Sequence, residues 1–218
     1  MGGFKSEAVN VAFDNGVISI IIAHLIKCSK KMKADCIVDN NPLINHEDRV
    51  TDRLIAKYLN AEPDNFRYEP QSPENFNEDT DHYIGRTDIK VISRDYFNVS
   101  AQAYFVIECK RIDGSNDLNK KYITEGVARF VCHPTKYSSY YKQNIMFGYV
   151  VRALDISDNA GQIDKLQSYL LKEVMATNLV LKQNDDPQYC IYVCEYVSTH
   201  IGRIELSHLF FNFADAIS

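Results

Sequence analysis

Two segments decide the fold of this chain, GRTDIKV at residues 85–91 and FVIECKR at residues 105–111. Both are rich in β-branched and aromatic residues, a composition that predicts β-strands. We expect the two strands to pair antiparallel with Asp88 opposite Glu108. All even-numbered residues of both strands then share one face of the sheet. The odd-numbered residues are mostly apolar, and they then form the face that packs on the core.

The even-numbered face carries the residues that predict chemistry. Directly opposed positions bring Cβ atoms within about 5 Å, so Asp88 and Glu108 would repel each other unless a cation neutralised them. Mg²⁺ prefers oxygen ligands of this kind and is commonly held by one or two carboxylates, waters and a phosphate. Lys110 projects to the same side, where it can hold or help deprotonate an attacking water. The pattern predicts phosphodiester hydrolysis, and a surface ladder of salt bridges is the alternative.

Helical and strand periodicities extend the prediction outward from these two segments. Apolar residues at helical spacing precede them, and Asn45 is the predicted N-cap of the second helix. Helices mixed with strands in one core indicate an α/β or α+β fold. We expect helices at 6–33, 46–60, 117–132 and 160–176, and strands at 66–69, 84–92, 102–112, 145–152, 189–197 and 202–206. A connection around Asn98 joins the two deciding strands.

Length and composition are those of a globular domain. The chain has 218 residues, 45% of them hydrophobic and 24% charged, with a net charge of −5. These values exclude disordered, collagen-like and coiled-coil classes. We expect one nuclease-like domain over 1–218. Its predicted parts are N-terminal helices at 6–60, an acidic loop region at 61–82, a catalytic core at 84–152, and a C-terminal helix and strands at 153–218.

The negative charge is concentrated in one part of the sequence. Residues 61–82 contain seven acids and a single arginine, and their three prolines interrupt any helix. We therefore expect an exposed acidic loop there. Residues 86–152 contain eleven bases and six acids. This segregation predicts a basic catalytic half that can approach a nucleic acid, with the acidic loop outside it.

The sequence also indicates the cellular environment. The longest apolar run, residues 17–26, is interrupted by His24 and is too short to span a bilayer, so we expect no membrane partner. None of the six cysteines forms a Cys-x-x-Cys pair or a zinc spacing. Cys190 and Cys194 are expected to be two buried thiols on one face of a strand. A reduced, cytoplasmic protein fits these features best.

Taken together, these motifs resemble the PD-(D/E)XK nuclease superfamily. The similar features are Gly85-Arg86-Thr87-Asp88, then Glu108-Cys109-Lys110, with Glu47 on an upstream helix. The matching order of elements covers residues 46–152. Thr87 stands where the family name has proline. The resemblance implies a restriction-endonuclease-like mixed β-sheet flanked by helices.

The resemblance also implies the composition of the site. Mg²⁺, or Mn²⁺ in its place, would be bound by Asp88 and Glu108, with the Cys109 backbone carbonyl as a further ligand. Lys110 would assist the water, and Glu47 would support the metal directly or through water. Asp48, Asp52 and Glu7 are rivals to Glu47 for this last role. The expected catalytic residues are Glu47, Asp88, Glu108 and Lys110.

The basic residues around the motif are the expected nucleic-acid contacts. They are Arg86, Lys90, Arg111, Lys120, Lys121 and Arg129. In similar nucleases the helix after the motif often supplies a polar residue to the site, and Glu125 or Arg129 is the candidate here. The alternative, favoured for any single residue, is an amphipathic helix whose charged side chains face solvent. The tyrosines of 137–142 can stack on bases or pack on the sheet, and packing is the expected role for most of them. DNA is the expected substrate by analogy, and a homodimer is compatible with the resemblance.

One other class of function fits the same sequence. The scaffold can serve as a non-catalytic nucleic-acid-binding or protein-interaction module, because the acidic segment 61–82 would repel a phosphate backbone if it lay near the site. A structural subunit that uses the apolar segment 209–213 as a contact is a third reading, although core packing explains that segment better. The sequence contains no Gly-x-Ser-x-Gly motif and no phosphate-binding loop.

Overall fold

The structure is a computed structural model that describes residues 7–61, 65–93, 103–137 and 139–218. The predicted connection around Asn98 lies outside these residues. Among them, no helix is long and apolar enough to cross a membrane. All six cysteines are free, and Cys190 and Cys194 are buried in the same hydrophobic cluster, as predicted.

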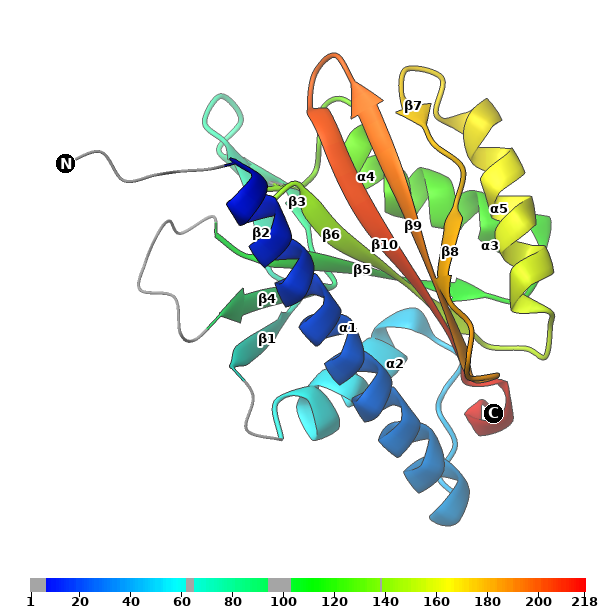
Figure 1. Cartoon of the computed structure of the whole chain (residues 1–218). Helices are drawn as coiled ribbons and strands as arrows, with labels where there is room; N and C mark the ends of the chain where they lie inside the picture. Colours follow the sequence, from blue (N-terminus) through cyan, green and yellow to red (C-terminus); the bar gives the residue numbers. More distant parts are fainter. Residues whose placement is uncertain (1–6, 62–64, 94–102, 138) are drawn as a thin grey trace.

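The core of the molecule is a mixed eight-stranded sheet with the order β1-β4-β5-β6-β10-β9-β7, in which β8 also pairs with β9 (Figure 1). The pairs β5–β6 and β6–β10 are parallel, and the pairs β1–β4, β4–β5 and β9–β10 are antiparallel. The strands of this sheet are β1 (Phe66–Pro70), β4 (Ile89–Ser93), β5 (Phe105–Ile112), β6 (Gln143–Val150), β7 (Met175–Ala176), β8 (Val180–Gln183), β9 (Tyr189–Ser198) and β10 (Gly202–Asn212).

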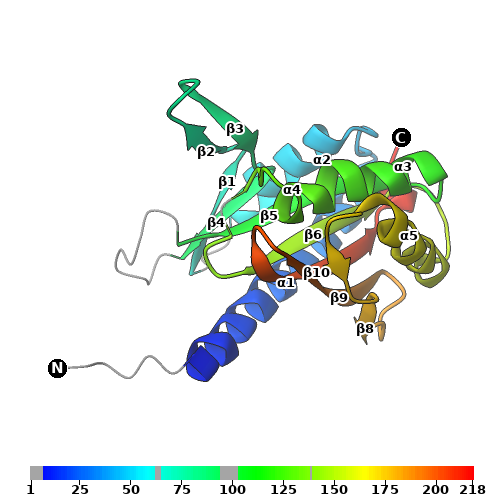
Figure 2. The ribbon, with the colours of Figure 1, turned by 90° about the horizontal axis from the view of Figure 1, so that it is seen from above.

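Helices cover both faces of this sheet (Figures 1 and 2). One face packs against α1 (Glu7–Val38), α2 (Glu47–Leu54) and the wider helical turn η1 (Ile55–Leu59). The other face packs against a second set of helices. These are α3 (Asn116–Lys121), η2 (Tyr122–Val127), α4 (Ala128–Val131) and α5 (Ile156–Leu170), and the short η3 (Ala214–Ala216) closes the chain.

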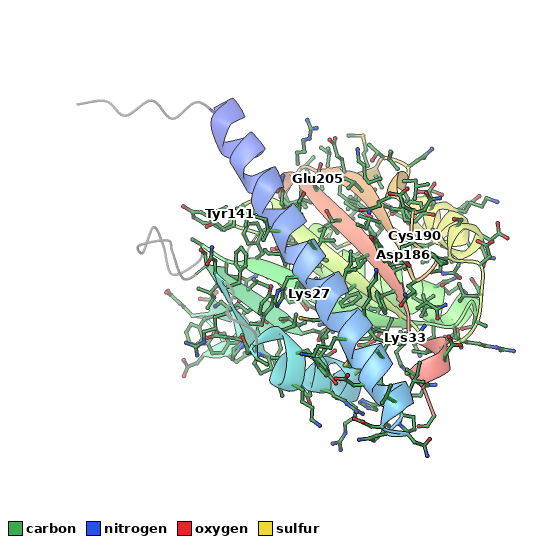
Figure 3. All side chains as sticks on the ribbon, turned by 60° about the horizontal axis from the view of Figure 1, so that its bottom comes forward. Lys27, Lys33, Tyr141, Asp186, Cys190 and Glu205 are labelled. Carbon is green, nitrogen blue, oxygen red and sulfur yellow. The ribbon has the colours of Figure 1, made fainter. Side chains whose placement is uncertain are left out.

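Successive side chains of β5 point to opposite faces of the sheet, and both faces are buried. Ile107 and Cys109 belong to the cluster under α1, whereas Val106 belongs to the cluster under η2 and α4. Helix α1 crosses the sheet diagonally (Figure 3). Its buried residues recur every three or four positions, as a helix with one apolar face requires. They are Val17, Ile18, Ile21, Ile22, Leu25, Cys28, Ser29, Met32, Lys33 and Cys36.

Most predicted elements are confirmed, with shifted ends. The helix predicted over 6–33 continues to Val38, and the helix predicted over 160–176 begins at Ile156 and ends at Leu170. The predicted N-cap at Asn45 is wrong, because α2 begins after His46, which makes no side-chain capping bond. The apolar segment 209–211 lies within β10 and is buried, so it belongs to the core.

The prediction of an acidic loop over 61–82 is wrong for its second half. There the chain forms β2 (Pro73–Asn77), which pairs antiparallel with β3 (His82–Arg86) in a separate two-stranded sheet. This hairpin projects from the body of the molecule (Figure 2). One of its acids, Glu74, is buried and accepts hydrogen bonds from the Tyr104 hydroxyl. The strand predicted over 84–92 is therefore two strands, interrupted at Thr87 and Asp88.

Candidate active site

The register of β4 against β5 places the two motif carboxylates together. Ile89 pairs with Ile107 and Val91 pairs with Phe105, which is the predicted antiparallel register. Asp88, one residue before β4, lies beside the middle of β5, where its Oδ2 accepts a hydrogen bond from the Cys109 amide at 2.7 Å. The backbone of β5 thus orients one carboxylate, while the other projects from the adjacent residue of β5.

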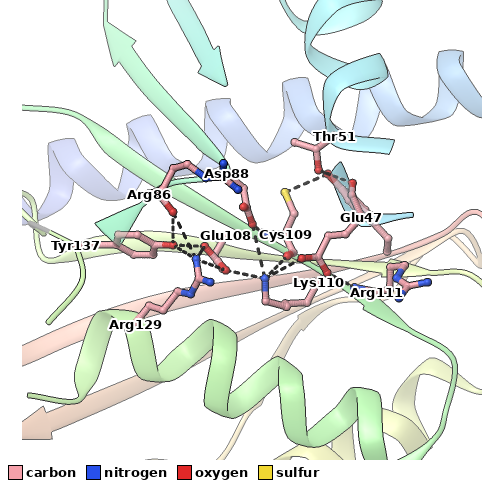
Figure 4. Close-up of polar contacts among 11 residues, drawn as sticks. Glu47, Thr51, Arg86, Asp88, Glu108, Cys109, Lys110, Arg111, Arg129 and Tyr137 are labelled. Atoms are coloured by element: carbon pink, nitrogen blue, oxygen red, sulfur yellow. Dashed lines mark hydrogen bonds and ion pairs between the residues drawn. The ribbon is translucent and has the colours of Figure 1, made fainter. Parts of the chain in front are cut away.

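Lys110 occupies the centre of the site (Figure 4). Its Nζ lies 2.6 Å from Glu108 Oε1, 2.9 Å from Glu47 Oε1 and 2.8 Å from the Cys109 carbonyl oxygen. Asp88 Oδ2 is 3.8 Å away. The side chain of Lys110 is only 7% exposed, so its charge is compensated by these oxygens and hardly by water. Four oxygens, from α2, from β5 and from the residue before β4, therefore converge on the Lys110 ammonium.

Glu47 reaches the site from the first turn of α2. Besides its bond to Lys110, its Oε2 accepts a hydrogen bond from the Arg111 amide at 3.0 Å. Thr51, one turn later, donates its hydroxyl to the Glu47 carbonyl and lies 3.0 Å from the Tyr149 hydroxyl on β6. These contacts fix α2 against the sheet and aim Glu47 at Lys110.

The rivals to Glu47 are placed less centrally. Asp48 lines the cavities above the site, and Asp52 is exposed on the outer side of α2. The side chain of Glu7 lies outside the part of the chain whose side chains the structure describes. Of Glu47, Asp48 and Asp52, Glu47 is the one with an ion pair to Lys110.

Glu108 is held at its second oxygen by residues that follow the motif. The Tyr137 hydroxyl hydrogen-bonds Glu108 Oε2 and also lies 3.0 Å from the Arg86 carbonyl oxygen. Arg129 Nη1 donates to the Tyr137 hydroxyl at 2.7 Å and lies 3.2 Å from Glu108 Oε1. Arg129, and not Glu125, is thus the residue of this helical segment that contacts a motif carboxylate.

Tyr137 has a polar role in the site that the sequence does not indicate. The tyrosines of 137–142 predict packing or stacking, and Tyr137 is indeed 2% exposed. Its hydroxyl contact to Glu108 depends on a loop between α4 and β6 that returns to β5, so spacing alone carries no signal for it. The resemblance to a known site also offers none, because it assigns no tyrosine.

Burial dominates the electrostatics of the carboxylates. Glu108 is fully buried, and desolvation together with the nearby Asp88 charge raises its pKa to about 8 despite Lys110 and Arg129. Burial also raises the pKa of Asp88, against the opposing effect of Lys110. Burial lowers the pKa of Lys110, but the carboxylates of Glu108, Asp88 and Glu47 outweigh it and raise that pKa. Lys110 is therefore a permanent cation in this arrangement.

Two cavities meet over these residues and share Glu47, Asp48 and Lys110. One has a volume of about 340 Å³ and the other of about 400 Å³. The first is further lined by Tyr83, Ile84, Gly85, Arg86, Asp88, Arg129 and Lys136. The second is further lined by His46, Arg111, Leu118, Lys121 and Glu125. The two cavities together make a polar groove, and bases line both of its halves.

Four of the six predicted nucleic-acid contacts line this groove, Arg86 and Arg129 in one half, Arg111 and Lys121 in the other. The structure places the other two elsewhere. Lys90 lies over the Tyr104 ring with its Nζ 3.9 Å from Glu74. Lys120 is exposed on α3 and does not line either half of the groove. Lys136, which the sequence did not single out, joins the first half.

The donors around Lys110 Nζ are of the kind that binds a hard divalent ion. Asp88, Glu108 and the Cys109 carbonyl already surround a positive charge, and oxygens of this type suit Mg²⁺ or Mn²⁺. In the described parts of the chain, no group of three or more His, Cys, Asp or Glu side chains is arranged to hold a metal ion. The donor set here consists of two motif carboxylates and one backbone carbonyl oxygen. The Lys110 ammonium occupies the position between these three groups. The chemistry of the donor set therefore fits such an ion.

A larger cavity lies away from these residues. It has a volume of about 570 Å³ between α1 and strands β8, β9 and β10, and isoleucines of both layers line much of it. It holds no motif residue. The chain matches no protein-family model, and comparison with curated proteins and with solved structures finds no match.

Proposed function

We propose that this protein is a metal-dependent nuclease with a restriction-endonuclease-like fold that hydrolyses phosphodiester bonds, with DNA as its substrate. One observation carries the proposal. Asp88, Glu108, Glu47 and the Cys109 carbonyl surround the Lys110 ammonium, which lines both halves of a groove that also contains further bases in each half. A surface ladder of salt bridges does not account for this arrangement, because Glu108 is fully buried.

Asp88, Glu108 and the Cys109 carbonyl would hold the ion, with Glu47 supporting them. A bound Mg²⁺ supplies charge stabilisation for the phosphate oxygens and lowers the pKa of water. Tyr137 and Arg129 donate to the second oxygen of Glu108, while Lys110 and Arg129 lie beside its first oxygen. The carboxylates are thereby oriented before a substrate binds, which reduces reorganisation during the reaction.

Lys110 contributes as a hydrogen-bond donor and a positive charge. Its raised pKa keeps it protonated at neutral pH as long as the carboxylates surround it. In that state it orients a water or balances a phosphate oxygen, and it does not accept a proton. Arg86 and Lys136 in one half of the groove, and Arg111 and Lys121 in the other, supply the attraction for a phosphate backbone.

A cleavage assay tests the proposal directly. Purified protein is incubated with plasmid and with linear DNA in Mg²⁺ or Mn²⁺, alongside Asp88→Asn and Lys110→Ala. We expect metal-dependent cleavage by the wild type and a loss of roughly 10²-fold or more in both variants, the scale for removing one stabilising group from a polar site. Asp185→Asn, an exposed change in the turn between β8 and β9, is the matched control and should retain full activity.

Two results would contradict the proposal. Cleavage that persists unchanged in Asp88→Asn would show that the activity arises elsewhere. Absence of both cleavage and Mn²⁺ binding in a folded wild-type protein would favour the alternative of a non-catalytic binding or interaction module.

A further inference from the structure

The β2–β3 hairpin presents two aromatic side chains to solvent. Phe76 and Tyr83 face each other across the hairpin, their ring centroids are 5.2 Å apart in an edge-on arrangement, and their exposures are 50% and 54%. A cross-strand aromatic pair stabilises a hairpin. That role does not require half of each ring to stay in contact with water, so the exposed ring surface is left to be explained.

Tyr83 connects this pair to the candidate site. It lines the same cavity of about 340 Å³ as Asp88 and Lys110. The other lining residues of that half include Arg86 and Lys136, which are exposed bases. An aromatic surface and a cationic rim therefore border one cavity that ends at the carboxylates. That combination fits a nucleotide, which has a flat uncharged base and a charged phosphate.

The hairpin is anchored firmly enough to act as a fixed platform. Glu74 of β2 is buried under the Tyr104 hydroxyl, and Asn75 Nδ2 donates to the Thr135 carbonyl at 3.0 Å. Gly85 of β3 lies so close to Lys136 that an added Cβ would be 2.3 Å from its carbonyl oxygen. Three contacts thus hold both strands against the body of the protein, and the ring of Tyr83 is positioned accordingly.

The charges of the hairpin limit what can lie on it. Its turn carries Glu78, Asp79 and Asp81, all exposed. These acids repel phosphates, so the backbones of a duplex lying across the hairpin would be disfavoured. A single strand can keep its phosphates over the basic half of the groove and turn its unpaired bases toward the rings of Phe76 and Tyr83.

We propose that Phe76 and Tyr83 form a base-stacking platform, and that the substrate of the adjacent site is a nucleic acid with an unpaired segment at the position of cleavage. The inference rests on the proposed function and narrows its substrate class. Tyr83 is a positioning residue here, since it orients the strand and takes no part in bond cleavage.

Binding measurements test this without relying on cleavage. Fluorescence anisotropy with EDTA present compares a labelled single-stranded oligonucleotide with a duplex of the same sequence. We expect the wild type to bind the single strand more tightly. Tyr83→Ala should weaken single-strand binding roughly 5- to 100-fold, the range for loss of one stacked base, while Tyr83→Phe should retain it. An oligonucleotide containing 2-aminopurine should lose fluorescence on binding to the wild type and Tyr83→Phe, but not to Tyr83→Ala.

Tyr169→Ala is the matched control, because Tyr169 is 72% exposed on α5 and lines neither half of the groove. The platform is refuted if Tyr83→Ala binds the single strand as tightly as Tyr169→Ala does. It is also refuted if the wild type binds the duplex as tightly as the single strand. If the wild type still cleaves DNA in those cases, the proposed function survives and only the platform is lost. If the wild type neither binds nor cleaves any nucleic acid, both fail.

Discussion

Lys110 is the residue on which the electrostatics of the site depend. Its ammonium group is the common partner of Glu47, Asp88 and Glu108, and buried carboxylates without such a partner are strongly unfavourable. A divalent ion held by the same oxygens would compete with the ammonium for them. The two cations cannot share the position, so the Lys110 side chain would have to move aside for such an ion.

This competition leads to a measurable result for Lys110→Met. Without ions, the variant should be less stable than the wild type by about 3–5 kcal/mol, the usual effect of removing one member of a buried ion pair. Added Mn²⁺ should raise the melting temperature of the variant more than that of the wild type, because no ammonium has to be displaced. Thermal unfolding with and without Mn²⁺ measures both effects.

Lys165→Met provides the control for that experiment. Lys165 is exposed on α5, and its replacement should change neither the stability nor the response to Mn²⁺ appreciably. A Mn²⁺ shift in Lys110→Met that is equal to or smaller than the wild-type shift would contradict the competition.

At the residue scale, the sequence predicted which motif residues lie together, but not which other side chains contact them. Asp88, Glu108 and Lys110 could be grouped because a strand pair has a fixed two-residue period, and the register of β4 against β5 confirmed that grouping. The contact of Tyr137 with Glu108, and that of Arg129 with Tyr137, depend on the path of the loop between α4 and β6 back to the sheet. No local periodicity encodes such a return.

At the scale of elements, the β2–β3 hairpin is the largest departure from the predicted structure. Its prolines and acids are typical of a loop, but contacts with residues distant in sequence stabilise the strand conformation. Glu74 is buried because Tyr104 donates to it and Lys90 lies nearby, both from elements more than ten residues away. Strands β7 and β8 were also missed, since each is short and pairs only with β9 in the described structure.

Gly85 allows β3 to approach the loop that precedes β6. The contact of its position with the Lys136 carbonyl leaves no room for a methyl group, so Gly85→Ala should lower the free energy of unfolding by about 1–3 kcal/mol, as overpacking usually does. Gly161→Ala is the contrasting change, because an added Cβ meets nothing within 4 Å in α5. That variant should be more stable by about 0.5–1 kcal/mol.

Urea unfolding monitored by circular dichroism distinguishes these two glycines. The midpoint should fall for Gly85→Ala and rise for Gly161→Ala. An unchanged midpoint for Gly85→Ala would mean that the hairpin is not held against Lys136 as the structure shows.

At the scale of the whole molecule, two buried groups on opposite sides of neutral pH shape the stability. His208, enclosed by the Tyr122 and Tyr196 hydroxyls, has its pKa lowered to about 3 by burial. Glu108, facing Lys110, Arg129, Tyr137 and Asp88, has its pKa raised to about 8. A lowered histidine pKa contributes stability that is lost as pH falls below 6.5. A raised glutamate pKa contributes stability that is lost as pH rises from 4.5 to 8.

The metal-free protein should therefore be most stable on the acidic side of neutrality. Of these two effects only that of Glu108 acts above pH 6.5, and it should lower the stability with a slope of up to about 1.4 kcal/mol per pH unit. Glu108→Gln removes the titrating group and should flatten this fall. Chemical unfolding between pH 5 and pH 8.5 in EDTA measures both profiles. Parallel profiles for the wild type and Glu108→Gln above pH 6.5 would contradict the assignment.

The position of Lys110 also bears on whether the protein folds before or after it binds an ion. Zinc fingers and similar small domains remain unfolded until their ion arrives, because the binding of the ion supplies most of their folding free energy. Here the chain supplies its own counter-ion, covalently attached to β5 and present as soon as the strand forms. We therefore expect folding to require no divalent ion, whereas the proposed activity does require one. Under the proposed function, a cell short of Mg²⁺ or Mn²⁺ would accumulate protein that is folded but inactive. This protein would become active once the ion is available again.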